Sequence, residues 1–279
     1  MLKLLERNIA SVEDRLVIVV PPRTTLPDHF KNVSLDDDKH ERLVRDMQHL
    51  RGSIYLNDGA VGFEQLTADG LHQTPEDEKS WHLLMLGREG RVSSCVWYLE
   101  HANTARVEQL RVRHCPLARN GWQGVLWRAV ESELAQARRD GLRYGEVGGW
   151  AVTKSSRCTS EGLLLALAAY SLGRIRGGAL GMTTATVRHS SSTILRRLGG
   201  SSLEVDGIRV PSYFDPAYGC EMELLRFDSR RPNPKYVDLV EVLRSKLGNV
   251  AVVATNRAAV PETFRYVAPG AKPQPQFAA

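Results

Sequence analysis

The chain has 279 residues, of which 42% are hydrophobic and 25% charged, and its formal net charge is +5. These proportions are those of an ordinary soluble globular protein. The longest apolar stretch, Gly162–Leu172, is much shorter than the roughly 20 residues that a membrane-spanning helix needs, so we expect no membrane span.

The amino-terminal part of the chain predicts a strand, an arm and a helix. Arg15–Val20 is mostly apolar and stops at two prolines, which indicates a short strand before a loop rich in Pro, Asp and Ser. Asp38–Leu50 repeats apolar residues at helical spacing and predicts a charged helix with one inner side. Arg51–Leu56 is consistent with a strand or with a helix end, and Asn57–Glu78 is a long polar connection.

The middle of the chain predicts strands around a second helix. Trp81–Leu86 and Arg91–Leu99 alternate apolar and polar residues on either side of a Gly-bearing turn, which indicates a β-hairpin. Arg106–Val112 alternates in the same way and predicts another strand. Gln123–Arg139 has apolar residues at helical spacing, and Arg143–Val152 predicts the strand that follows.

The remaining elements continue the alternation of helix and strand. The expected helices are Gly162–Ile175, Ser190–Leu198 and Lys235–Leu247, and the expected strands are Ala179–Val187, Glu204–Val210, Glu221–Phe227 and Val250–Ala254. This order predicts an α/β (α+β) fold with a central mixed, largely antiparallel sheet and helices on both faces.

We expect four parts along the chain. They are an amino-terminal strand and arm (1–37), a main domain (38–227), a carboxyl-terminal helix and strand packed on the core (228–254) and a tail (255–279). Pro and Ala accumulate in the tail, which predicts disorder.

Several classes of site and partner are disfavoured. Cys95, Cys115, Cys158 and Cys220 show no CxxC spacing, so we expect no metal site and no disulfide framework, and a reducing cytoplasmic location. Acidic residues interrupt the amino terminus, which therefore lacks a signal-peptide core. Arginines occur in pairs, without a run of five or more cations and without interleaved aromatic residues, so nucleic-acid binding is not favoured.

One stretch, Ala105–Leu134, combines a strand, a Gly-bearing bend and a helix. Such a loop leaves backbone N–H groups pointing outward at the helix start, where they can hold phosphate oxygens. The stretch resembles the signature motif of GNAT-superfamily acyltransferases, in which a strand ending Leu-x-Val precedes Arg/Gln-x-x-Gly-x-Gly/Ala. Arg119 matches the leading Arg and Gly124 the last Gly, whereas Trp122 replaces the first Gly. The resemblance implies that an acyl carrier's pyrophosphate is bound by Leu110, Val112, Arg119, Asn120, Gly121, Trp122, Gln123 and Gly124. The alternative is a plain connection between strand and helix.

A second stretch, from His189 to Gly200, resembles the last core helix of GNAT enzymes. Its serines predict a helix cap and Gly199 predicts the helix end. Leu195 stands where the family has a Tyr that often protonates the leaving thiolate, so the resemblance does not imply that role here.

Three residues stand where a general base can act in such an enzyme. An acyl thioester is already activated, so the enzyme chiefly brings an amine beside it and removes the ammonium proton. Glu108 lies in the predicted strand before the loop, Glu146 lies in the next strand among glycines, and His189 begins the last core helix. We rank Glu108 first and Glu146 second. The alternative roles are salt bridges for the two glutamates and a helix-start position for His189.

The amino-terminal half also resembles one branch of the superfamily, which holds acyl-homoserine-lactone synthases and long-chain N-acyl amino acid synthases. In that branch an Arg precedes a Val/Ile-Phe/Tyr pair and an acidic cluster precedes the first hairpin, positions that Arg51 and Asp77 match. An Arg of the lactone synthases would fall near Trp97, so their substrate contacts do not carry over. The alternative is that Arg51 and Asp77 are solvated loop charges.

The apolar stretch Gly162–Leu172 is hydrophobic on all sides and must be buried. It is a core helix or one wall of a slot for an acyl chain.

Together the resemblances imply an N-acyltransferase that moves an acyl group from acyl-CoA or acyl carrier protein to a small-molecule amine by direct attack on the thioester. The mildly basic charge suits the phosphates of acyl-CoA or an acidic acyl carrier protein. The alternative is a catalytically silent GNAT-fold protein with a binding or regulatory role.

Overall fold

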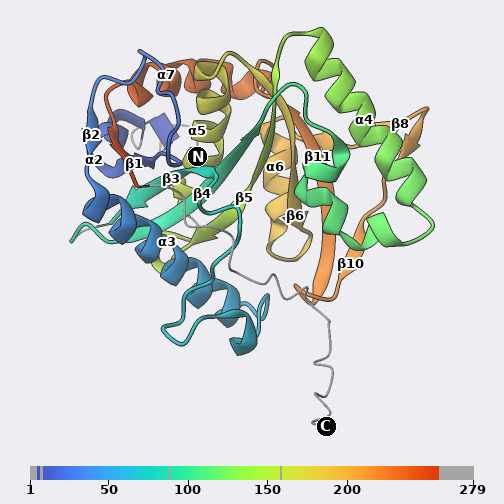
Figure 1. Ribbon diagram of the computed structural model, residues 1–279, viewed down its shortest axis with the longest axis horizontal. Coiled ribbons are helices and arrows are strands. Elements are labelled where there is room, and N and C mark those ends of the chain that lie inside the picture. The colour runs from blue at the N-terminus through green and yellow to red at the C-terminus, as the bar shows by residue number, and fades with distance from the viewer. Residues whose placement is uncertain (1–4, 7–8, 88, 158, 258–279) are drawn as a thin grey trace.

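Ten strands form one central sheet in the computed structural model of the protein, which describes residues 5–6, 9–87, 89–157 and 159–257. The strand order is β10-β11-β6-β5-β4-β3-β1-β12-β2, and β7 also pairs with β11 (Figure 1). The strands of this sheet are β1 (Leu16–Val19), β2 (Val33–Leu35), β3 (Ser80–Leu86), β4 (Val92–His101), β5 (Arg143–Val152), β6 (Ala179–Thr186), β7 (Ser201–Ser202), β10 (Tyr213–Asp215), β11 (Cys220–Asp228) and β12 (Ala251–Ala254).

The sheet is mixed and largely antiparallel, as predicted. The pairs β5–β6, β1–β12 and β12–β2 are parallel, whereas the hairpin β3–β4 and its neighbours are antiparallel. Parallel neighbours need a crossover connection, and between β5 and β6 this connection is helix α5 (Glu161–Ile175).

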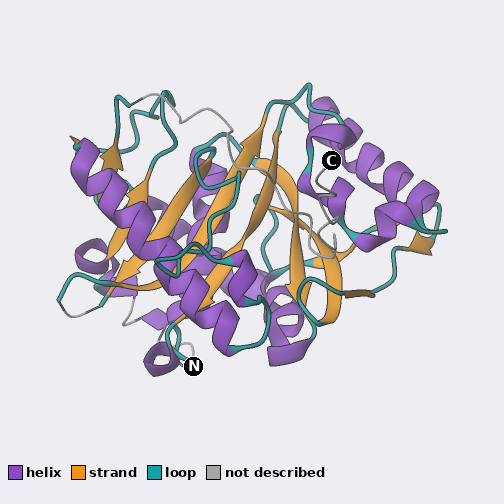
Figure 2. Ribbon diagram, turned by 60° about the horizontal axis from the view of Figure 1, so that its bottom comes forward, coloured by secondary structure: helices purple, strands orange, loops and turns teal. Residues whose placement is uncertain are grey.

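Helices cover both faces of the sheet (Figure 2). The helices α3 (Asp37–Asn57) and α4 (Gln123–Arg139) lie on one face, each over its own apolar cluster. The other face carries α5, α6 (Ser191–Leu198) and α7 (Val237–Leu247), which share a third cluster with the sheet and with the short amino-terminal helix α2 (Val12–Arg15). The prediction of helices on both faces is therefore confirmed.

The central position of α5 explains its composition. Leu164, Leu165, Leu167 and Leu172 are fully buried, because the sheet lies on one side of the helix and α7 on the other. A helix covered on both sides must be apolar all round. The Ser171 hydroxyl donates to the carbonyls of Leu167 and Val240, so the polar residue in this helix is also paired inside the protein.

Two predicted strands are wrong. Arg106–Val112 forms short 3₁₀ turns, η2 (Val107–Gln109) and the start of η3 (Arg111–His114), which lie beneath α4. Both edges of β4 are already paired, with β3 and β5, so no free edge of the hairpin remains for this segment. Glu204–Val210 is a small separate hairpin of β8 (Glu204–Val205) and β9 (Ile208–Arg209). Its two turn residues, Asp206 and Gly207, both have positive φ, as a tight two-residue hairpin turn requires.

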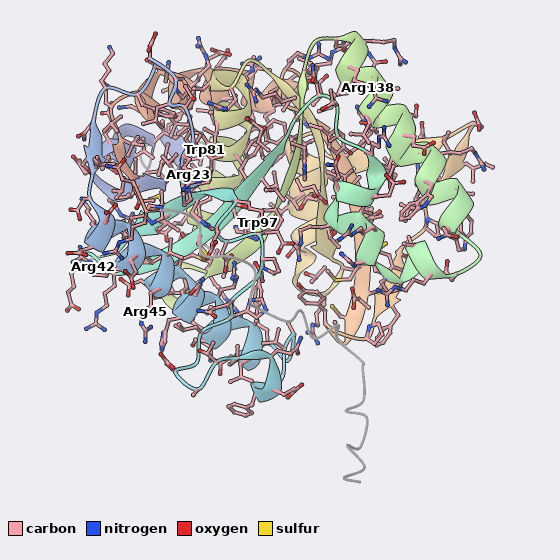
Figure 3. The ribbon with its side chains drawn as sticks, viewed as in Figure 1. Arg23, Arg42, Arg45, Trp81, Trp97 and Arg138 are labelled. Carbon is pink, nitrogen blue, oxygen red and sulfur yellow. The ribbon has the colours of Figure 1, made fainter. Side chains whose placement is uncertain are left out.

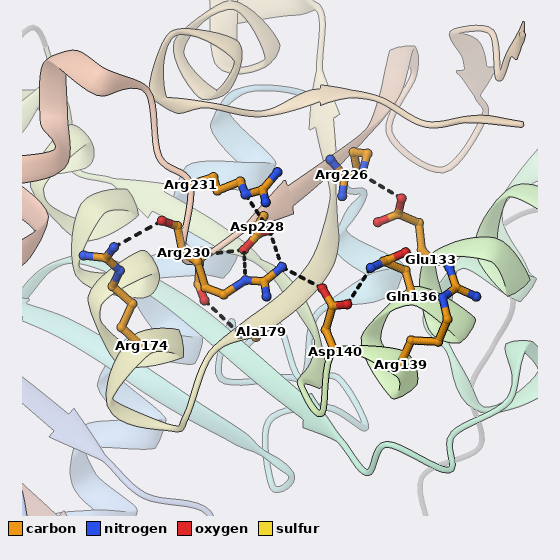
Figure 4. Close-up of polar contacts among 11 residues, drawn as sticks. Glu133, Gln136, Arg139, Asp140, Arg174, Ala179, Arg226, Asp228, Arg230 and Arg231 are labelled. Carbon is orange, nitrogen blue, oxygen red and sulfur yellow. Dashed lines mark hydrogen bonds and ion pairs between the residues drawn. The ribbon is translucent and has the colours of Figure 1, made fainter.

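Ion pairs fix the outer helix α4 to the sheet. Arg226 of β11 donates to Glu133 at 2.7 Å, and Arg230 reaches Asp228 at 2.8 Å and Asp140 at 2.9 Å (Figure 4). Because Arg230 joins the end of β11 to the end of α4, these contacts set the angle at which α4 lies over the strands.

The carboxyl-terminal strand β12 lies between β1 and β2, inside the sheet. Of the predicted disordered tail, only Thr255–Arg257 is described, and the Thr255 hydroxyl donates to Asp37 at 2.6 Å; residues 258–279 lie outside the described residues. Within the described ranges, no helix is long and apolar enough to cross a membrane.

Candidate functional site

The parallel strands β5 and β6 separate toward their carboxyl ends. They pair from Arg143 and Ala179 as far as Val147 and Thr183. Beyond these residues β5 stays with β4 and β6 stays with β11, so the two strands diverge (Figure 1). An opening at the carboxyl ends of parallel strands is a common place for a ligand site in sheets of this kind.

A cavity of about 1980 Å³ occupies this opening. Tyr55 and Arg111 line it on the face that carries α3, and Ala166 and Ala169 of α5 line it on the opposite face. The cavity therefore passes between β5 and β6 from one face of the sheet to the other. Its volume exceeds the roughly 300–1,000 Å³ of a pocket for one drug-sized ligand, so it has room for more than one small ligand.

The separation begins at a bulge in β5 that Trp97 fills. The register between β4 and β5 shifts between Cys95 and Trp97, and Gly149 has a φ of +64°. The Trp97 indole lies near the centre of the molecule (Figure 3), against the backbone of Gly148 and Gly149, where a Cβ on either glycine would overlap it. The guanidinium of Arg111 lies 5.0 Å from the centre of the indole ring. The glycines therefore make room for an aromatic floor of the cavity.

Glu146 is a buried carboxylate on the cavity wall. Both of its oxygens accept from the backbone N–H of Arg111 at 3.0 Å, and Oε2 also lies 2.9 Å from His101 Nε2. The side chain is 6% exposed. The carboxylate thus has a fixed orientation beside the point where β5 and β6 part.

Arg51 and Asp77 form a buried ion pair behind the cavity. The Arg51 guanidinium donates to both Asp77 oxygens, at 2.8 and 2.7 Å, and its Nε donates to His72 Nδ1 at 3.0 Å. Burial alone would raise the pKa of Asp77, but the charge and hydrogen bonds of Arg51 outweigh it and hold that pKa well below its usual range. Burial, reinforced by the Arg51 cation, lowers the pKa of His72 to about 3. The two residues singled out by the sequence are therefore paired and buried, and not solvated loop charges.

The loop between β5 and α5 reaches the same cavity. Ser156, Arg157, Thr159, Ser160 and Gly162 line it. The first turn of α5 is held in place from behind, because the Glu161 carboxylate accepts from Arg15 at 2.7 Å, from Ser93 at 2.7 Å and from Ser94 at 2.8 Å. The start of a helix therefore faces the opening between the parallel strands, where backbone N–H groups favour an anion.

Sequence reasoning did not select this loop, although a signal was present. Arg157–Gly162 matches Arg-x-x-Gly-x-Gly at its first and last positions, with Ser160 in place of the middle Gly. It lies in the short connection from β5 to α5, whereas the segment around Arg119 lies in a longer connection from β4 to α4 that also contains η2 and η3.

The residues predicted from the sequence lie in different places. Glu146, Val112 and Arg119 line the cavity, and Leu110 is buried beneath α4. Glu108 is exposed, and the described residues that line the cavity do not include it. Five further predicted residues are also exposed and are not among the described residues that line the cavity: Asn120, Gly121, Trp122, Gln123 and Gly124. The backbone of His189 lies in η6 (Arg188–Ser190), but its side chain lies outside what the structure describes. The ligand-binding and catalytic roles assigned to these residues stay predictions.

Several solved structures are similar to this chain at low sequence identity. No protein-family model matches the chain, and no curated protein matches its sequence. The CoA-dependent acyl-homoserine lactone synthase BjaI matches with a TM-score of 0.49 and 13% identity over 88% of this chain and 95% of its own. FeeM, an N-acyl amino acid synthase from uncultured soil microbes, matches with a TM-score of 0.44 and 11% identity over 71% of this chain and 89% of its own. The lactone synthase LasI matches with a TM-score of 0.42 and 16% identity over 68% and 84% of the two chains. These solved structures are acyl-homoserine lactone synthases and an N-acyl amino acid synthase.

Proposed function

We propose that the protein is an N-acyltransferase that moves an acyl group from a thioester carrier, acyl-CoA or acyl carrier protein, to a small amine. One observation carries the proposal. A cavity passes between two parting parallel strands, with a buried carboxylate, Glu146, on one side and the apolar helix α5 on the other. Such a passage lets a thioester and an amine enter from opposite faces and meet at the strands.

The donor occupies the side of α5. The start of α5 and the hydroxyl residues before it suit the phosphates of a pantetheine carrier, and Arg157 adds a cation beside them. The acyl chain lies along Ala166 and Ala169, the small residues of α5 that line the cavity. Small side chains leave space along an otherwise closed helix, so the preferred acyl group is longer than acetyl.

The acceptor amine enters from the side of α3, where Glu146 and the aromatic floor lie. Glu146 takes a proton from the ammonium, and the free amine attacks the thioester carbon. The intermediate then collapses and the carbon–sulfur bond breaks. The carrier leaves as a thiolate and takes up the proton that the attacking nitrogen loses as the amide forms. Beyond Val147 and Thr183 the described parts of β5 and β6 no longer pair with each other, so backbone N–H groups of the facing edges can stabilise the oxyanion.

The test combines binding and turnover. A series of acyl-CoA thioesters from acetyl to dodecanoyl should raise the melting temperature, because a ligand at 100 times its Kd adds about 2.7 kcal/mol to native stability. A panel of amines should then release free thiol from the stabilising donor. If neither acyl-CoA nor acyl carrier protein stabilises the protein, the assignment is wrong.

The hydrogen bonds of Glu146 favour a second function. Glu146 already accepts three hydrogen bonds, from the N–H of Arg111 to each oxygen and from His101, and these also suit a carboxylate that merely ties η3 to the sheet. In that case the protein is a silent acyl-carrier-binding or regulatory protein. Stabilisation by acyl-CoA without thiol release for any amine would support this alternative. For either function we propose a cytoplasmic location, where such carriers are made.

A further inference from the structure

Two arginines from different elements converge on one aspartate at the open edge of the cavity. Arg157 follows β5 and Arg188 follows β6, so they stand at the carboxyl ends of the two parting strands. The Arg157 guanidinium donates to the Asp58 carboxylate at 2.7 Å, and the Arg188 guanidinium donates to the Asp58 backbone carbonyl at 2.8 Å. Asp58 itself is the C-cap residue of α3.

This arrangement has the geometry of an anion site. Two guanidinium groups, each able to bind two oxygens at once, point to the same small region of the cavity wall. Among the described residues, the Asp58 carboxylate pairs with Arg157, while Arg188 donates to a neutral backbone carbonyl. A phosphate or pyrophosphate group carries enough negative charge to balance both guanidinium groups. The site therefore suits a phosphate better than it suits its present occupant.

The contacts of Asp58 are also easy to exchange. The Arg157 side chain is 37% exposed and that of Asp58 21% exposed, and ion pairs with this much access to water contribute little to stability. Asp58 is the C-cap residue of α3, held by its own backbone N–H to Ile54 and Leu56, so its side chain can turn away while α3 stays in place.

We propose that Asp58 is an internal substitute for the phosphate of the carrier. Before a ligand enters, its carboxylate accepts from Arg157 and its backbone carbonyl accepts from Arg188. The entering phosphate displaces the carboxylate from Arg157 and binds Arg188 beside the carbonyl. Because the Arg157 contact joins α3 to the loop after β5, the same displacement releases the Arg157 side chain from α3. This inference rests on the proposed function for the identity of the carrier, but not for the existence of the anion site.

The experiment measures the affinity of the full chain for coenzyme A and for inorganic pyrophosphate by calorimetry. Asp58→Asn keeps the shape and the helix end but removes the charge. We expect it to bind both probes roughly two- to five-fold more tightly, the factor equivalent to one exposed ion pair. Arg157→Gln and Arg188→Gln should bind both probes more weakly. In the double variant Asp58→Asn/Arg157→Gln the gain should shrink, because the two residues act on the same contact.

Asp69→Asn is the matched control. It removes one carboxylate that pairs with Arg45 at 2.5 Å, does not line the cavity, and should leave both affinities unchanged. If Asp58→Asn binds the probes equally or more weakly, or if no variant binds either probe, the inference is overturned. If Asp58→Asn binds pyrophosphate more tightly while no variant binds coenzyme A, the anion site stands and the CoA form of the proposed donor fails.

Discussion

At the scale of single residues, the environment of a carboxylate separates the two candidate bases. Glu108 and Glu146 occupy similar positions in the sequence pattern, but Glu108 is exposed in a 3₁₀ turn, whereas Glu146 is buried at the parting of the strands. A base must lie within hydrogen-bond reach of its proton in the bound complex. Geometry therefore favours Glu146 for the role that sequence reasoning gave first to Glu108.

Replacement of each glutamate by glutamine, in separate variants, tests this assignment. Glu146→Gln should lower turnover by roughly 10²–10⁴ at neutral pH, with little change in donor affinity, because only proton removal is lost. Glu108→Gln is the matched control and should keep normal turnover. Steady-state thiol release at saturating donor gives both values. Full activity of Glu146→Gln would move proton removal to water or to another group.

The buried pair of Arg51 and Asp77 makes the protein sensitive to acid through its neighbour His72. In an unfolded chain the pKa of a histidine is near 6.5, whereas in the folded protein that of His72 is about 3. Between these values the unfolded chain holds a proton at His72 that the folded protein does not. The free energy of unfolding should therefore fall as the pH falls below about 6.5, by up to about 1.4 kcal/mol per pH unit for this residue.

His72→Asn isolates the contribution of that histidine. The amide oxygen can still accept from Arg51 Nε, as His72 Nδ1 does, but it does not titrate. Urea unfolding between about pH 7 and pH 4.5 should show a shallower decline in stability for the variant. Asp77, whose pKa is lowered, contributes stability that is present above about pH 4 and is lost only at lower pH, so it does not obscure this window. Equal slopes for the two proteins would contradict the assignment.

At the scale of elements, α5 is both a core helix and a cavity wall, which the sequence left as alternatives. Leu164 and Leu167 fill the core, while Ala166 and Ala169 line the cavity. A helix that crosses between two parallel strands has its first turn at their carboxyl ends. The position of α5 in the fold therefore lets Ala166 and Ala169 line the cavity while both side chains stay buried.

A larger side chain at Ala166 of α5 tests whether this helix lines the pocket for the acyl chain. Ala166→Phe should shift the preferred donor to shorter acyl chains, because the ring fills space beside the bound chain. Ala168→Phe is the control, since Ala168 is fully buried and does not line the cavity. It should destabilise the protein by about 1–3 kcal/mol through overpacking and leave the preference unchanged. Turnover of a series of acyl-CoA thioesters, with thermal unfolding of each variant, gives both readings. An unchanged preference in Ala166→Phe would make acetyl-CoA the default donor.

At the scale of the whole molecule, the sheet pairs strands from the amino-terminal and carboxyl-terminal parts of the described chain. β12 lies between β1 and β2, and α7 covers α5. Val240, Leu243, Val252 and Val253 are fully buried. The carboxyl-terminal segment is therefore part of the sheet and core that support the cavity, and not only a helix and strand laid on a finished domain.

A shortened chain that ends after Asp228 tests this dependence. It loses β12, leaves β2 without a neighbour and uncovers α5, so we expect no cooperative thermal unfolding and rapid proteolysis. Circular dichroism during heating and limited proteolysis compare it with the full chain. A cooperative transition at the normal temperature would show that the residues after Asp228 are dispensable for folding.

The sequence alone determined the local elements and some of the residues that matter. The sequence pattern defined α4 and β5 with the bounds that the structure has. Resemblance singled out Arg51 and Asp77, and a place among glycines in a predicted strand singled out Glu146 as the second candidate base. These signals depend on neighbours along the chain. Only the tertiary structure decided which Gly-bearing loop faces the cavity. That choice follows from the parallel pairing of β5 with β6, which lie about one helix apart in sequence, and from the closed edges of β4. Pairing between distant segments and the burial it produces are properties of the whole fold, so the pattern at Arg106–Val112 could suggest a strand where the sheet had no edge to accept one.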